Sequence, residues 1–182
     1  ARKDQSEAVR EFFQLFKTNW EFYSDNRIYD VVVATAPDFV AADARLTVIC
    51  STAQCVFDTN AGIRTRPMVG EAFLETDRIE LPVYKGLSEI HGGGRPALRV
   101  KGGPGIAGVE IEKTGGRVIR AGYDLFDEVV FLLSSGQPSE NAAIPTLDLH
   151  IALLRNWMLD RGISFVEIPP VPAGFDFSVC LT

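Results

Sequence analysis

Two short runs of apolar residues constrain the fold more than any other feature of this sequence. Residues 28–35 read Ile-Tyr-Asp-Val-Val-Val-Ala-Thr, and residues 46–51 read Leu-Thr-Val-Ile-Cys-Ser. A strand that is apolar on both faces is typical of a sheet that is covered on both sides. Because helical patterns alternate with these and further strand patterns, the sequence predicts an α/β fold with a mixed, mostly parallel sheet flanked by helices.

The helices and the turns between strands have recognisable signals. Aromatic residues at helical spacing predict an opening helix that runs to Tyr23, with Asp4 as its cap. A glycine-containing turn predicts a β-hairpin near residues 109–121. Asp124 is a good N-cap for the next helix, and Thr146 is expected to cap the last one.

Two stretches lack a clear pattern. Residues 52–74 show no periodicity, and we expect them to be irregular and exposed. Residues 86–108 carry two glycine groups around a short apolar run, and they are expected to be the loosest part of the chain.

The charge balance argues against some classes of partner. The chain has 24 acidic and 18 basic residues, and its basic groups are small and scattered. A nucleic-acid-binding protein usually carries a basic stripe, so no nucleic-acid partner is expected. No apolar run is long enough to cross a bilayer, so no membrane partner is expected either. Three cysteines without a disulfide framework or a signal segment indicate a cytoplasmic location.

Few residues suit catalysis or metal binding. There are only two histidines, His91 and His150, and Cys50 and Cys55 lie too far apart for a zinc knuckle. No metal site is therefore expected within this chain. A thiolate with a histidine base is conceivable, but a buried strand cysteine is more often inert because a reactive thiol needs an exposed, electropositive setting.

A small set of polar residues remains as candidate ligand-binding or domain-interface positions. Asp148, His150 and Arg155 belong to the predicted last helix, where we favour a solvated or domain-facing stripe over a catalytic pair. Asp124 and Tyr84 complete the set. No residue of the chain is assigned a catalytic role.

The last third of the chain carries a resemblance. It reads Ala-Gly-Tyr-Asp-Leu-Phe-Asp-Glu at residues 121–128, Pro-Thr-Leu-Asp at 145–148, Phe-Val-Glu-Ile-Pro-Pro at 165–170 and Phe-Ser-Val-Cys-Leu-Thr at 177–182. Over about residues 121–182 this resembles the region leading into the catalytic domain of bacterial polysaccharide deacetylase-like proteins. In that family the first barrel strand ends in Leu-Thr, and a His-Asp motif that binds a divalent metal follows. This sequence ends just before such a motif.

The resemblance implies an organisation and a function. Residues 1–168 are expected to form an α/β accessory domain, residues 169–174 a proline-rich linker, and residues 175–182 the truncated first strand of a following deacetylase-like domain. That domain would be the partner of this one and would hold the metal. The accessory domain would be non-catalytic, either a scaffold or a module that positions a glycan, for which Trp20, Tyr23 and Tyr84 are the candidate aromatic contacts.

Two other functions stay open. Residues 117–124 are faintly similar to glutamine-amidotransferase-like domains, which suggests a self-contained small-molecule enzyme using Cys50 or Cys55. That family also needs a His-x-Glu pair, which cannot be placed here. The aromatic residues between 7 and 23 alternatively suggest a protein–protein interaction module that pairs through the opening helix.

Overall fold

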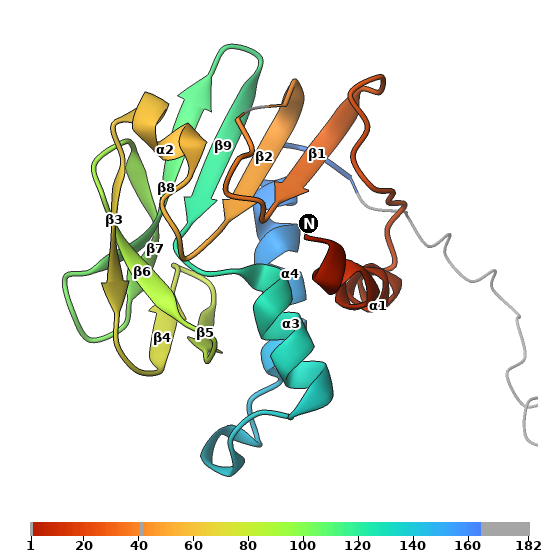
Figure 1. Ribbon diagram of the computed structural model, residues 1–182. Coiled ribbons are helices and arrows are strands. Elements are labelled where there is room, and N and C mark those ends of the chain that lie inside the picture. The colour runs from red at the N-terminus through yellow and green to blue at the C-terminus, as the bar shows by residue number, and fades with distance from the viewer. Residues whose placement is uncertain (1, 41, 165–182) are drawn as a thin grey trace, which may run out of the picture.

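The computed structural model describes residues 2–40 and 42–164 (Figure 1). The chain forms, in order, η1 (Lys3–Gln5), α1 (Ser6–Phe16), β1 (Tyr29–Ala34), β2 (Ala44–Cys50), α2 (Val56–Ala61), β3 (Arg64–Met68), β4 (Ala72–Glu75), β5 (Glu80–Val83), β6 (Leu87–His91), β7 (Arg95–Val100), β8 (Ile106–Lys113), β9 (Gly116–Ala121), α3 (Leu125–Ser134), η2 (Ser139–Asn141) and α4 (Thr146–Leu159).

A seven-stranded sheet in the order β1-β2-β9-β8-β7-β4-β5 forms the centre of the molecule, and β3 and β6 form a separate antiparallel pair. The α/β class and the mixed sheet are confirmed. The parallel share is smaller than predicted, because among the described strands only β1–β2 and β2–β9 pair in parallel. The other four pairings of the large sheet are antiparallel. Three of them, β4–β5, β7–β8 and β8–β9, join consecutive strands through short connections, which can only join antiparallel strands. The predicted hairpin is confirmed as β8–β9.

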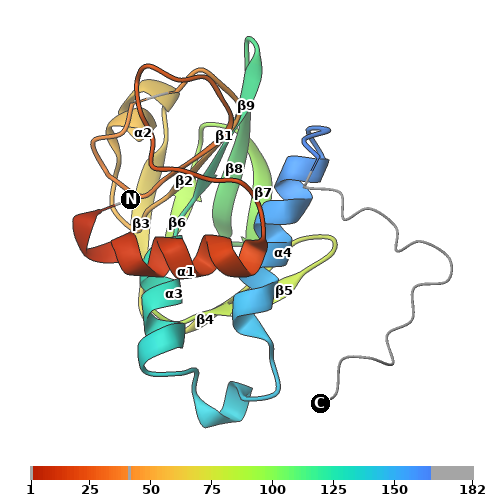
Figure 2. The same ribbon diagram turned by 90° about the vertical axis from the view of Figure 1, so that its right-hand side faces the viewer.

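Both faces of the sheet are covered, as the apolar runs predict. In β2, the side chain of Val48 belongs to a core cluster shared with α1, α3 and α4, whereas Ile49 belongs to a second cluster with residues of α2 and β6. Figure 2 shows α1 lying across α3, with α4 beside them. A strand sandwiched between two cores must be apolar at consecutive positions, which explains the composition of β2.

The opening helix is shorter than predicted. It ends at Phe16, and Lys17 takes a left-handed conformation with φ 57° while its backbone N–H donates to the carbonyl of Phe13. Such a cap ends a helix whatever aromatic pattern follows. Trp20 and Tyr23 therefore lie on an irregular segment after α1, and Asp4 lies within η1 rather than at a cap position.

The two patternless stretches are more regular than expected. Residues 52–74 contain α2, β3 and most of β4, and residues 86–108 contain β6, β7 and the start of β8. The short strand β3 is largely exposed, so no apolar alternation reveals it. Gly94 reflects close packing rather than looseness, because a Cβ there would lie 2.3 Å from the carbonyl oxygen of Glu110.

The last helix begins at Thr146, but this residue does not cap it. Its hydroxyl lies 3.5 Å from the carbonyl oxygen of Ile144, and Pro145 occupies the cap position. Gly162, with φ 63°, follows the helix. The predicted linker at 169–174 and truncated strand at 175–182 lie outside the described residues, as do residues 165–168 of the predicted accessory domain.

Candidate functional site

The carboxyl ends of the three parallel strands are where α/β proteins usually place functional groups. Asp124, three residues after the end of β9, is 5% exposed and caps α3 by accepting hydrogen bonds from the backbone N–H groups of Phe126 and Asp127 at 3.0 and 3.1 Å. The cap predicted at Asp124 is thus confirmed. Burial raises the pKa of the Asp124 carboxyl, and its hydrogen-bond donors partly offset this.

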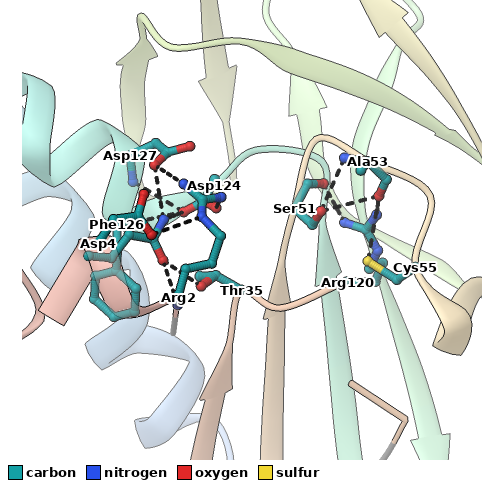
Figure 3. Close-up of polar contacts among 11 residues, drawn as sticks. Arg2, Asp4, Thr35, Ser51, Ala53, Cys55, Arg120, Asp124, Phe126 and Asp127 are labelled. Carbon is teal, nitrogen blue, oxygen red and sulfur yellow. Dashed lines mark hydrogen bonds and ion pairs between the residues drawn. The ribbon is translucent and has the colours of Figure 1, made fainter. Parts of the chain in front are cut away.

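The N-terminal segment is tied to this cap (Figure 3). The guanidinium of Arg2 donates to Asp124 at 3.0 Å and to Asp127 at 2.5 Å, and the amide of Gln5 donates to both carboxylates at 3.0 Å. The hydroxyl of Thr35, directly after β1, donates to the Gln5 carbonyl oxygen at 2.8 Å. Every member of this cluster is already bonded within the chain, so the cluster fastens η1 to the sheet.

A second polar cluster lies beside the first, at the end of β2 (Figure 3). Arg120 and Asp58 are both fully buried and form an ion pair at 2.8 Å. The remaining guanidinium N–H groups donate to the backbone carbonyls of Ser51, Ala53 and Ala121. This arrangement holds the loop between β2 and α2 in place, and it leaves no donor of Arg120 for a ligand.

Glu128 is the most perturbed carboxyl group of the described residues. It is fully buried in α3 and accepts hydrogen bonds from the backbone N–H groups of Tyr84 and Lys85. Burial raises its pKa to about 7, although these donors and the charge of Lys85 act in the opposite direction. One feature of the sequence points to Glu128: it lies in a helix that is apolar nearly all round. A carboxylate in such a helix is expected to be buried and to need hydrogen-bond donors.

His150 is a core residue rather than part of a stripe. It is 1% exposed, its Nδ1 lies 3.3 Å from the hydroxyl of Tyr123, and its Nε2 has no hydrogen-bond partner among the described residues. Burial lowers its pKa to about 3, so it is neutral at physiological pH. Asp148 and Arg155 are exposed on the same helix, so the structure does not bring these three side chains together.

Tyr84 is half-buried, and its ring packs against Phe131 at 5.5 Å between centroids. Its hydroxyl is buried and has no partner within the described part of the chain. The backbone N–H of Tyr84 donates to Glu128, which lies in α3 one turn after the cap residue Asp124.

The thiols are not poised for chemistry. Cys50 is fully buried in β2, and desolvation raises its pKa to about 12. Cys55 is 2% exposed, and burial also raises its pKa. Among the described residues, no group of three or more His, Cys, Asp or Glu side chains is arranged to hold a metal ion.

Two open cavities mark the surface. The larger, about 710 Å³, lies along β1 and is lined by aromatic side chains of α1 and of the segment after it. The smaller, about 500 Å³, lies between α4 and the strands β4 and β7, where Arg78 pairs with Asp160 and Arg95 with Glu110.

Comparison with known proteins gives no assignment. No protein-family model matches the chain, and no curated protein matches it significantly. Within the described residues, no helix is both long and apolar enough to cross a membrane.

Proposed function

We propose that this chain is a non-catalytic domain that supports the catalytic domain of a polysaccharide deacetylase-like protein. The observation that carries the proposal is how the chain uses the residues of the resemblance. Tyr123, Asp124, Phe126 and Glu128 are all at most 5% exposed. The side chains of Tyr123, Asp124 and Glu128 bond to other parts of the chain. A motif used in this way serves to build a stable domain.

The state of the thiols and of His150 favours this function over an amidotransferase-like enzyme. A nucleophilic cysteine must be accessible and easily ionised. Cys50 is neither, and Cys55 is buried with a raised pKa. His150 is neutral and enclosed by the core, where no substrate reaches it.

Support of the catalytic domain is favoured over direct glycan contact. Carbohydrate-binding aromatic residues present a free ring face, yet Trp20 stacks on Phe13 at 5.3 Å and Tyr84 packs against Phe131. Tyr23 is 47% exposed and is the one of the three glycan candidates with a largely open side chain.

Two assays test this function. The 182-residue chain is expected to release no acetate from N-acetylated chito-oligosaccharides and no ammonia from glutamine, and titration with these sugars should leave its tryptophan fluorescence unchanged. Acetate or ammonia release that is lost on Cys55→Ser would overturn the proposal. Saturable sugar binding that is lost on Tyr23→Ala, but kept in the matched variant Tyr84→Phe, would replace support by glycan positioning.

The parent gene gives an independent check. A His-Asp-x-Asp sequence directly after Thr182 is the expected continuation, and the divalent metal would belong to that following domain. Any unrelated continuation contradicts the deacetylase-like assignment.

A further inference from the structure

Charged side chains line the smaller of the two cavities. It lies between the turn that joins β4 to β5, the strand β7 and the second half of α4. Three arginines, Arg78, Arg95 and Arg99, and four carboxylates line it. Its volume of about 500 Å³ falls within the range of about 300–1000 Å³ that is typical of small-molecule sites. A ligand can use only those charged groups that the chain itself leaves unpaired.

Two of these arginines are already paired within the chain. The Nη2 group of Arg95 lies 2.6 Å from the carboxylate of Glu110, which Arg117 also contacts at 3.1 Å. The Nη1 group of Arg78 lies 3.3 Å from the carboxylate of Asp160 and joins the β4–β5 turn to the end of α4. These pairs hold the walls of the cavity together and neutralise Glu110 and Asp160.

Arg99 is different, because it forms no ion pair or hydrogen bond within the described residues. It is exposed on β7, and its register partner on β4 is Glu75. Opposite charges at directly paired positions stabilise a sheet when they meet, yet no ion pair joins these two side chains in the structure. The planar guanidinium of Arg99 therefore keeps all its N–H donors, and their fork matches the two oxygens of a carboxylate.

The remaining unpaired groups of the cavity form hydrogen bonds of other kinds. Glu75 and Asp77 lie on the side of the β4–β5 turn, and neither forms an ion pair within the described residues. The half-buried side-chain amide of Asn156, in α4, offers both a donor and an acceptor. The buried side chains of Leu153 and Trp157 add an apolar surface to the lining.

These unpaired groups define the chemistry of a ligand. A phosphate group carries roughly −1.5 to −2 charges at pH 7, and Glu75 and Asp77 repel it. A single carboxylate on a molecule rich in hydroxyl groups fits better, because Arg99 binds the carboxylate while the acidic side chains accept hydrogen bonds from the hydroxyls. We propose that this cavity binds a sugar acid through these contacts, either as a free molecule or as one uronate unit of an acidic polysaccharide. Asn156 is a further hydrogen-bonding partner.

The inference goes beyond the proposed function and does not depend on it. The cavity contains none of the candidate aromatic contacts Trp20, Tyr23 and Tyr84. The neutral chito-oligosaccharides that test those residues lack a carboxylate, so the two sets of experiments can fail separately.

Isothermal titration calorimetry of the full chain with galacturonate and with its linear trimer tests the proposal. Saturable binding is expected at pH 7 and low salt, where exposed charges are least screened. Tighter binding of the trimer identifies the polysaccharide as the source, and equal affinities identify the free acid. Arg99→Gln should weaken binding by about tenfold or more, because a charge-assisted pair is lost, whereas Arg64→Gln, at an exposed position of β3, should leave it unchanged. Absence of saturable binding, or equal affinity in Arg99→Gln and the unmodified chain, contradicts the assignment.

The fluorescence of Trp157 locates the ligand without a change to the cavity. In the variant Trp20→Phe, Trp157 is the only tryptophan of the chain, so its emission reports on this cavity. Galacturonate is expected to change the emission. Galactose lacks the carboxylate, inorganic phosphate carries more charge and alanine lacks the hydroxyl groups, so none of the three should do so. Calorimetric binding without a change in Trp157 emission, or an equal response to any of these three compounds, would overturn the proposal.

Discussion

Replacing Glu128 by Gln removes the carboxyl group whose pKa is raised most clearly, and it should change the pH dependence of stability in a defined direction. Glu128 has a pKa of about 7 in the folded chain against an ordinary value of 4.5. Between these values the folded state holds a proton that the unfolded state has lost. Stability therefore falls as pH rises from about 4.5 to about 7. At about 1.4 kcal/mol per pH unit, the decrease is about 3 kcal/mol.

His150 acts in the opposite direction over part of the same range. Its pKa is about 3 in the folded chain and 6.5 ordinarily, so the unfolded state binds the proton first as pH falls. This group alone makes stability rise by about 5 kcal/mol between about pH 3 and pH 6.5. The contributions of Glu128 and His150 oppose each other from about pH 4.5 to 6.5, so the effect of Glu128 is best seen as a difference between two proteins.

The assay is urea unfolding followed by the fluorescence of Trp20 and Trp157, at intervals from pH 4.5 to 7.5. The free energy of unfolding of Glu128→Gln, minus that of the unmodified chain, is expected to become more positive by about 3 kcal/mol across this range. Glu11→Gln, at an exposed position of α1, is the matched control and should show no such trend. His150→Gln should show a trend of the opposite sign below pH 6.5.

The sign of the difference is what tests the reasoning. The backbone N–H groups of Tyr84 and Lys85 stabilise the ionised carboxylate, whereas burial destabilises it. If the difference between Glu128→Gln and the unmodified chain stays constant or becomes more negative with rising pH, the hydrogen bonds outweigh burial. The raised pKa would then be refuted.

Three further outcomes follow from the buried polar groups. Asp58→Asn leaves the buried guanidinium of Arg120 without its counter-charge, so the free energy of unfolding measured in urea should fall by about 3–5 kcal/mol. A loss below about 1 kcal/mol would show that the pair is solvated. Asp124→Ala removes the cap of α3 together with the anchor of η1, so the stability measured by thermal unfolding with circular dichroism should fall by about 1–3 kcal/mol. An unchanged midpoint of unfolding would contradict this role of Asp124. In the Cys180→Ser chain, Cys50 and Cys55 should react with a disulfide reagent at pH 7 at least tenfold more slowly than free cysteine, and rapid labelling would revive a catalytic thiol.

Local patterns in the sequence predicted the elements that are decided locally. The cap at Asp124 was predictable because its side chain bonds N–H groups only two and three residues away. The hairpin of β8 and β9 likewise depends on one turn. Pro82 is tolerated within β5 because this strand lies at the edge of the sheet.

The charged residues of the site that the sequence did not reveal share a physical cause. Arg2, Arg120 and Glu128 carry charges that the sequence assigns to solvent by default. Their partners lie far away in the chain: Arg2 bonds Asp124 across 122 positions, and Arg120 bonds Asp58 across 62. His150 was expected on a solvated or domain-facing stripe. The sequence of a helix alone does not show which of its faces packs against distant parts of the chain.

The sequence by itself determined that β2 is sandwiched between two cores, that an α/β sheet forms and that Asp124 starts a helix, because each follows from side-chain polarity and hydrogen bonding over a few residues. Only the tertiary structure decided the order of the strands, the small share of parallel pairing and the burial of His150, Arg120 and Glu128. It also decided that β1, among the described strands, is the first of the large sheet. These features depend on which distant segments meet, and a local pattern of polar and apolar residues does not encode that meeting.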